Sequence, residues 1–145
     1  MDLAELNTVE LANEGVVMHV RGPLGPVYET DDEGKEIVDG DGKPVPVTIT
    51  LLGDDSDRMV QYDREQFNEG LKGGTAITAV SVETKAINRL AHATVAWSGI
   101  KWEKQVLSLT PENARLIYRK VRWLRASGQQ FVSDRANFSK ASPTA

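Results

Sequence analysis

The hydrophobic pattern of the first third of the chain is that of β-strands separated by turns. Residues 16–21 form a short run of β-formers, which the glycines and prolines of residues 22–26 bring to an end. Residues 45–53, VPVTITLLG, carry alternating β-branched side chains, so we expect them to pair with the first run. Between them, residues 30–44 have almost nothing to bury and contain Glu-Gly and two Asp-Gly steps, which predict a hairpin tip or mobile loop. A small antiparallel sheet or hairpin is therefore predicted for residues 14–53.

Helical spacing replaces this pattern from residue 54 onward. Acidic residues and Ser56 offer N-cap positions, and Met59, Val60, Phe67 and Leu71 follow helical spacing, which predicts a helix over about 55–72. A second helix, from Thr75 or Val80 to Trp97, is predicted by apolar positions at i, i+3, i+4, i+7 and i+8. Those positions are Ile87, Leu90, Ala91, Thr94 and Val95.

The last third begins with a connector, residues 101–109, of some extended character. Thr110 as N-cap and Pro111 at the first helical position then predict a helix start. The apolar stripe that follows continues to a helix end near Phe138. A break between Tyr118 and Trp123, or a kink at Ser127-Gly128, divides it into two helices or bends one.

These elements predict one domain of the α+β class over residues 1–145. A β-rich unit at about 14–53, with the mobile loop at 30–44, precedes a helical unit at about 54–138. The helical unit is expected to be a bundle of about four helices. Residues 139–145 are expected to be a flexible tail.

Composition removes several classes of function. The chain has no cysteine and two histidines, which excludes disulfides and thiolate metal sites. The acidic N-terminus lacks the order of a signal peptide, and no run approaches 18 apolar residues, so we expect a soluble intracellular protein without a membrane segment.

Charge is distributed unevenly along the chain. Residues 100–145 hold nine basic and three acidic residues, a net charge of +6, whereas residues 1–99 hold eight basic and 18 acidic residues, a net charge of −10. Such polarity favours an acidic partner at the basic end, or contact between the basic end of one copy and the acidic end of another. A homo-oligomer is therefore one expectation.

No catalytic or metal-binding arrangement stands out. The acidic stretch from Asp39 lacks EF-hand spacing, because its fifth and twelfth positions are Lys43 and Thr50. His92 lies about 130° from the centre of its helix's apolar face, and His19 has no catalytic neighbour in sequence. The glycines form no phosphate-binding loop. We expect no enzymatic activity, no cofactor and no bound metal.

The segment from residue 97 to 138 combines aromatic and basic residues, holding six of the nine aromatics. Such residues anchor protein interfaces and could form a groove for an amphipathic helix. Two other interpretations remain: the aromatics fill the core, with Trp102 and Trp123 as exceptions, or the basic residues bind nucleic acid, which the acidic total disfavours. The candidate partner-binding residues are Trp97, Trp102, Tyr118, Arg119, Arg122, Trp123, Arg125, Phe131 and Phe138.

Four stretches in order carry a resemblance to a known family: VTITLLGDDSDRM, VAWSGI, LTPENARLIY and WLRASGQQFVSDRANF. Over about residues 16–138 the chain resembles the tail assembly chaperones of long-tailed bacteriophages and prophages. It departs from the family pattern at YRKVRWLR, where relatives often have a proline between the two C-terminal helices.

The resemblance implies a protein of the host cytoplasm that binds the tape measure protein and keeps it soluble. It further implies recruitment of tail tube protein, absence from the mature virion, and in many phages a longer product made by translational frameshifting. Two alternatives stay open: a structural phage protein, such as a minor tail or head–tail joining component, and a nucleic-acid-binding factor.

Overall fold

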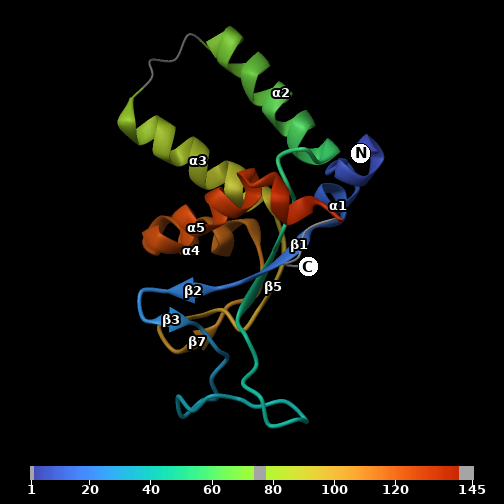
Figure 1. Ribbon diagram of the computed structural model, residues 1–145. Helices are drawn as coiled ribbons and strands as arrows, with labels where there is room; N and C mark the ends of the chain where they lie inside the picture. The colour runs from blue at the N-terminus through green and yellow to red at the C-terminus, as the bar shows by residue number, and fades with distance from the viewer. Residues whose placement is uncertain (1, 74–77, 141–145) are drawn as a thin grey trace.

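The computed structural model describes residues 2–73 and 78–140. A central antiparallel sheet has the strand order β1 (Val16–His19), β4 (Thr48–Leu51), β5 (Thr94–Ser98). The helices α3 (Ala79–Ala93), α4 (Pro111–Lys120) and α5 (Arg122–Ser133) pack together beside it, as Figure 1 shows. This mixed content confirms the α+β class predicted from the sequence.

The predicted pairing of the two early β-runs is confirmed. Strand β1 pairs antiparallel with β4 from Val16 opposite Leu51 to His19 opposite Thr48. The alternation along β4 puts Ile49 and Leu51 in the core, where both are fully buried. The N-terminal unit is not closed on itself, however, because β4 also pairs with β5 from the middle of the chain.

The prediction that the second helix continues to Trp97 is wrong. Helix α3 ends at Ala93, and residues 94–98 form β5, an edge of the central sheet. The carbonyl of Ala93 accepts a hydrogen bond from the backbone N–H of Leu52, at 2.9 Å, at the end of β4. Because residues 94–97 are rich in β-formers, the ladder to β4 outweighs the helical spacing that the same residues satisfy.

Beyond β1, three segments of the chain are joined by two rings of backbone hydrogen bonds. In one ring Val27 donates to Val20, Val20 to Val47, and Val47 to Val27, at 2.9–3.0 Å. A second ring joins Glu29, Ile37 and Val45 in the same cyclic manner at 2.7–3.0 Å. The first ring lies beside the short hairpin of β2 (Arg21–Gly22) and β3 (Gly25–Pro26). These rings satisfy the backbone where the regular ladder stops.

Residues 30–44, which we call the acidic hairpin, contain the same turn twice. The Asp31 carboxylate accepts from the backbone N–H groups of Glu33 and Lys35, and Asp39 accepts identically from Asp41 and Lys43. Each turn ends at a glycine with positive φ, 84° at Gly34 and 77° at Gly42. The carboxylates of Asp31 and Asp39 are thus part of the turn structure, and the hairpin projects from the lower end of the molecule in Figure 1.

Helix α2 (Asp57–Gly73) begins close to its predicted position but does not bury the predicted stripe. Met59 is fully buried, whereas Val60, Phe67 and Leu71 are exposed, the last two by about two thirds (67% and 71%). Figure 1 shows why: α2 diverges from α3 along its length, so no core lies beside its outer half. Near its start α2 is tied to α3 by Arg89, which forms 2.9 Å ion pairs with Asp54 and Asp63.

The C-terminal helices are separated as the sequence indicated. Thr110 caps α4 by accepting from the N–H of Asn113 at 3.1 Å, and Val121 separates α4 from α5. Ser127-Gly128 does not interrupt α5; a methyl group at Gly128 would lie 3.0 Å from Leu90, so the glycine allows α5 to approach α3 closely.

The helix predicted to end near Phe138 ends at Ser133 instead. A separate turn, η2 (Arg135–Phe138), follows it, capped by the Asp134 side chain. Two N-terminal elements, η1 (Leu3–Leu6) and α1 (Val9–Glu14), were not predicted. The hairpin of β6 (Lys101–Trp102) and β7 (Gln105–Val106) occupies the predicted connector. The predicted tail falls mostly on residues 141–145, which lie outside the described part of the chain.

Candidate partner-binding groove

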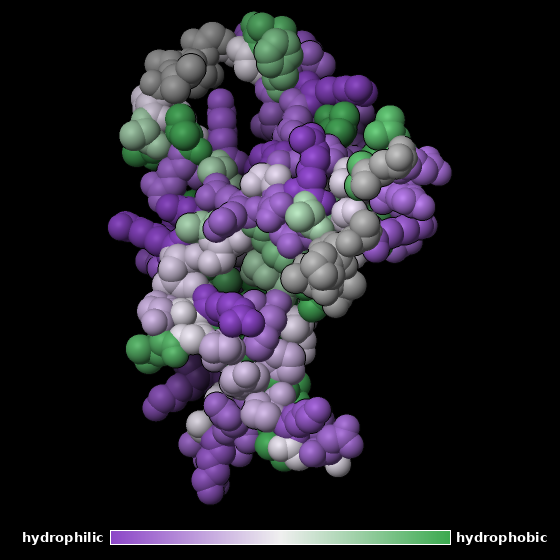
Figure 2. All heavy atoms as spheres, viewed as in Figure 1, coloured by the Kyte–Doolittle hydropathy of each residue, from purple (hydrophilic) through white to green (hydrophobic). Residues whose placement is uncertain are grey.

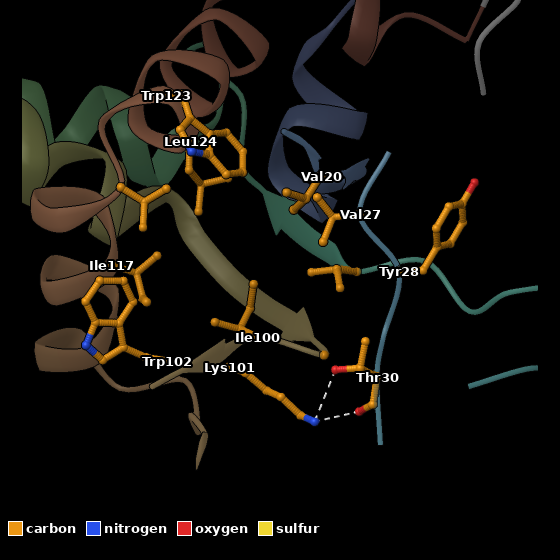
Figure 3. A pocket seen from close by; sticks show the side chains of 13 residues that line it. Val20, Val27, Tyr28, Thr30, Ile100, Lys101, Trp102, Ile117, Trp123 and Leu124 are labelled. Atoms are coloured by element: carbon orange, nitrogen blue, oxygen red, sulfur yellow. Dashed lines mark hydrogen bonds between the residues drawn. The ribbon is translucent and has the colours of Figure 1, made fainter. Parts of the chain in front are cut away.

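An apolar groove of about 280 Å³, which we call the tryptophan groove, lies between three parts of the fold (Figure 3). Its lining comes from the hydrogen-bonded ring of Val20, Val27 and Val47, which we call the valine ring, from the β6 strand with the residues before it, and from the junction of α4 and α5. The floor consists of buried aliphatic residues, namely Val20, Val47, Ile100, Ile117 and Leu124. The groove therefore offers a mainly apolar surface.

Two tryptophans from the predicted set line this groove. Trp123 is 38% exposed, and its ring lies so close to Gly22 that a methyl group there would be 3.3 Å from the ring. Trp102 is half-buried and packs against the core beside Ile117. Figure 3 shows the two indoles on different sides of the floor, Trp123 from α5 and Trp102 from β6. Trp123 thus packs against the protein with part of its ring and leaves the rest exposed.

Lys101 fixes the end of the groove next to the acidic hairpin. Its ammonium group donates to the backbone carbonyls of Thr30 and Asp31, at 2.7 and 2.9 Å, and to the Thr30 hydroxyl at 3.3 Å. All three acceptors are uncharged, so these contacts satisfy the donors without cancelling the positive charge. The lysine joins the first turn of the hairpin to β6 and leaves a cation at the groove.

Arg119 and Arg122 are exposed at the α4–α5 junction, as the sequence interpretation requires. Within residues 2–73 and 78–140 neither of them forms an ion pair, and the same holds for Lys120 between them. Because Val121 and Trp123 line the groove, these three cations lie next to it in the chain. They are exposed cations without an ion pair among the described residues, close in sequence to the lining of the groove.

Two of the predicted partner-binding residues are part of the core and require correction. Tyr118 is fully buried and Phe138 is 2% exposed, so neither can contact a partner in this conformation. Burial raises the pKa of the Tyr118 phenol to about 12, although its hydrogen bond to Thr94 opposes this. Phe138 packs edge-on against Phe131, with ring centroids 5.7 Å apart. Large apolar side chains are most often buried, and both Tyr118 and Phe138 follow this tendency.

The remaining predicted residues are not brought to the groove. The Trp97 indole donates to the Leu107 carbonyl at 3.0 Å and is half-buried against the core. Arg125 donates to Glu83 and to the Tyr118 carbonyl, at 3.1 and 3.2 Å, which ties α5 to α3 and α4. Phe131 is half-buried and lines a separate hollow with β1. Their contacts give these residues structural roles.

The valines of the groove floor were not identified from the sequence. Val20 and Val47 stand in two runs recognised only as strands, and Val27 follows a turn. Only the closed valine ring places these side chains opposite Trp123. The sequence offered one signal for this arrangement. A run of β-formers stops at Gly-Pro, and a second valine-rich run follows later in the chain.

The histidines make structural contacts in the described residues. His19 Nε2 lies 3.0 Å from the Val27 carbonyl, which implies a proton on that nitrogen. His92 stacks on Tyr62 at 4.5 Å and accepts a hydrogen bond from Arg58 at 3.2 Å. Burial, followed by the nearby Arg58 charge, lowers the pKa of His92. No group of three potential metal-ligating side chains occurs in the part of the chain that the structure describes.

Comparison of the chain with protein-family models, curated proteins and solved structures finds no match. Across residues 2–73 and 78–140, no helix combines the length and apolarity needed to span a bilayer.

Proposed function

We propose that this protein is a phage tail assembly chaperone that binds and solubilises the tape measure protein and helps to recruit tail tube subunits. The tryptophan groove is the observation that carries the proposal. A large apolar side chain of a partner helix would enter between Trp102 and Trp123, above the buried aliphatic floor. The sequence resemblance supplies the identity of the partner.

The chemistry of the groove favours an apolar helical segment flanked by acidic residues. Trp123 offers a partly exposed ring, and Arg122 and Lys120 beside it have no ion pair among the described residues. Tryptophan and arginine are the residues that most often carry binding energy in protein interfaces. A partner segment with a buried apolar residue and a carboxylate about one turn away would satisfy both.

A groove of about 280 Å³ accommodates few side chains, so each contact would be weak. Weak contacts repeated along a long partner suit reversible coating, because tail tube subunits must later displace the chaperone. On this proposal the protein acts in the host cytoplasm during assembly and is absent from the finished particle. It performs no chemistry.

The test is co-expression with the tape measure protein encoded beside it, followed by pull-down and measurement of soluble tape measure protein. We expect the wild-type chain to keep the partner soluble and attached. Trp123→Ala should reduce recovery of the complex by about tenfold, since truncating a central aromatic anchor costs more than about 1 kcal/mol. Phe67→Ala is the matched control, because it removes an exposed aromatic ring of α2, outside the groove.

Three outcomes would count against the proposal. If the tape measure protein is equally insoluble with and without this chain, the chaperone function is wrong. If Phe67→Ala lowers binding and Trp123→Ala does not, the function stands but the binding site lies on α2. If mass spectrometry finds the protein in purified particles at the level of structural subunits, the virion-component alternative is correct.

A further inference from the structure

The acidic hairpin is an exposed and strongly charged element of the described chain. Residues 31–44 are all exposed, and residues 30–44 carry six carboxylates and two lysines, a net charge of −4. Asp31 and Asp39 are used within the turns, whereas Asp32, Glu33, Glu36 and Asp41 form no side-chain hydrogen bond or ion pair among the described residues. Four carboxylates therefore face solvent.

The hairpin also exposes apolar side chains between its two turns. Ile37 and Val38 are 41% and 57% exposed, although the Ile37 backbone belongs to the second hydrogen-bonded ring. This backbone pairing holds the segment in a defined shape, so little conformational entropy would be lost on binding. The hairpin thus presents a preformed apolar strip with acidic residues on both sides.

A complementary surface lies between α3 and α5. An open groove of about 650 Å³, the α3–α5 groove, has an apolar wall of Ala79, Val82 and Ala86, with Val82 54% exposed. Glu83 and Arg125 also line it, but they neutralise each other at 3.1 Å. Arg122 is the remaining charged residue of the lining, so the groove is apolar with a positive edge.

The positive edge extends beyond Arg122. Arg119 and Lys120 are exposed in the last turn of α4, immediately before it in the chain. With Arg122, which lines the groove together with the exposed Val82, this makes three cations close in sequence that have no ion pair among the described residues. The acidic hairpin has the opposite charge and its own exposed apolar residues, so the two surfaces match in both respects.

We propose that the acidic hairpin of one copy docks on the α3–α5 groove of a second copy. In Figure 1 the hairpin projects from the lower end of the molecule, away from α3 and α5, so contact within one chain would require the hairpin to fold back. Two hairpins repel each other, as do two positive edges, so each contact joins a hairpin to a groove. Such contacts form a two-fold dimer if two copies exchange hairpins, and a ring or a helical filament if each copy binds a different neighbour.

This self-association does not depend on the identity of the tape measure protein, although it uses Lys120 and Arg122, which the contact proposed for that partner also uses. The two contacts are distinguished by studying the chain alone, in the absence of the tape measure protein. The charges that would meet lie at the exposed edge of the contact between hairpin and groove. The association is therefore expected to weaken as salt shortens the Debye length, from about 10 Å at 0.1 M to about 3 Å at 1 M.

The experiment measures the molar mass of the wild-type chain by sedimentation equilibrium against protein concentration, at about 0.05 M and about 1 M salt. The hairpin variant carries Asp32→Lys, Glu33→Lys and Glu36→Lys, and the edge variant carries Arg119→Glu, Lys120→Glu and Arg122→Glu. We expect association of the wild-type chain at low salt. Each variant alone should raise the dissociation constant by more than about tenfold, since like charges brought together disfavour the contact.

The charge swap separates this contact from general electrostatic attraction. The two variants mixed together should associate again, and so should one chain that carries both sets of changes. Arg64→Glu with Lys72→Glu, exposed on α2, is the matched control and should behave as the wild type. Circular dichroism of each variant checks that it is folded. If the hairpin variant is not folded, Asp32→Asn, Glu33→Gln and Glu36→Gln replace its changes, and if the edge variant is not folded, Arg119→Gln, Lys120→Gln and Arg122→Gln replace its changes.

Several results would overturn the proposal. A wild-type chain that stays monomeric at low salt up to its solubility limit contradicts it. Association that is unaffected by both variants, or that the α2 control abolishes equally, places the contact elsewhere. Loss in each variant without recovery in the mixture would mean that the two surfaces do not meet.

Discussion

The hydroxyl groups of Tyr118 and Thr94 lie 2.6 Å apart in the core and join α4 to the point where α3 becomes β5. Thr94 donates its single proton to the Leu90 carbonyl at 2.8 Å, so Tyr118 donates to Thr94. The pair closes the end of α3 and fixes the direction in which β5 leaves it. Tyr118 therefore belongs to the framework that holds the α4–α5 junction, and with it Trp123, in place.

Removing the acceptor should cost more than removing the donor. Thr94→Val leaves the buried Tyr118 hydroxyl without a partner and should lower the free energy of unfolding by about 1–3 kcal/mol, whereas Tyr118→Phe leaves Thr94 bonded to Leu90 and should cost about 0.5–1.5 kcal/mol. Urea denaturation of both variants and the double variant measures this. Equal and additive losses would show that the hydroxyls do not interact.

Alkaline pH should destabilise the protein through Tyr118. Its pKa is raised by burial to about 12 in the folded state, against 10.0 for the ordinary phenol. A pKa raised on folding contributes stability that is present below pH 10 and is lost as pH rises through about 12. The loss should be on the order of 3 kcal/mol, because the pKa is raised by about two units and each unit corresponds to about 1.4 kcal/mol. Tyr118→Phe should flatten the stability profile in this range; a wild-type profile already flat would contradict the prediction.

Mild acid should loosen α2 through His92. Burial and the neighbouring Arg58 lower its pKa below 6.5, and the ring accepts a hydrogen bond from Arg58 only when that nitrogen is unprotonated. A pKa lowered on folding contributes stability that is present above pH 6.5 and lost as pH falls through the folded-state pKa. Hydrogen exchange of α2 should therefore accelerate on acidification. His92→Gln, which cannot titrate, should remove this acceleration, and a persistent effect would point to other groups.

Arg89 should control how firmly α2 is held. Its guanidinium binds Asp63 through two nitrogens and Asp54 through a third, all at 2.9 Å. Arg89→Lys keeps the positive charge but cannot bind both carboxylates through three nitrogens. It should lower the free energy of unfolding by only about 1 kcal/mol, because solvent screens these partly exposed ion pairs. Hydrogen exchange should rise in α2 more than in β4. Arg64→Lys, on the exposed side of α2, is the control. A similar rise in hydrogen exchange in both variants would contradict the role of Arg89 in holding α2.

A side chain at residue 99 should be poorly tolerated. Gly99 has a φ of 80°, and a methyl group there would lie 2.2 Å from the Glu29 side chain. Gly99→Ala should cost more than about 1 kcal/mol from backbone strain and contact together. Adding Glu29→Ala should restore only the part of the lost stability that comes from contact with the Glu29 side chain. Full recovery in a thermal melt would mean that the backbone conformation carries no cost.

Local signals in the sequence were sufficient wherever the stabilising contacts are near in sequence. Thr110 and Pro111 start α4 because capping needs only the next three residues. The sequence offered a break between Tyr118 and Trp123 or a kink at Ser127-Gly128, and the structure has the break, at Val121. The pairing of β1 with β4 followed from two matched β-runs. The α+β class and the separation of acidic and basic halves likewise follow from the sequence.

Tertiary contacts decided the rest. Residues 94–97 satisfy both a helical and a strand pattern, and only hydrogen bonds to β4, more than 40 residues earlier, select the strand. Burial of Tyr118 and Phe138, and exposure of Phe67 and Leu71, depend on what packs beside each helix, which periodicity alone does not specify. The tryptophan groove exists because a ring of backbone hydrogen bonds brings Val20, Val27 and Val47 to the α4–α5 junction. Hydrogen bonds between residues this far apart in the chain produce no periodic pattern in the sequence.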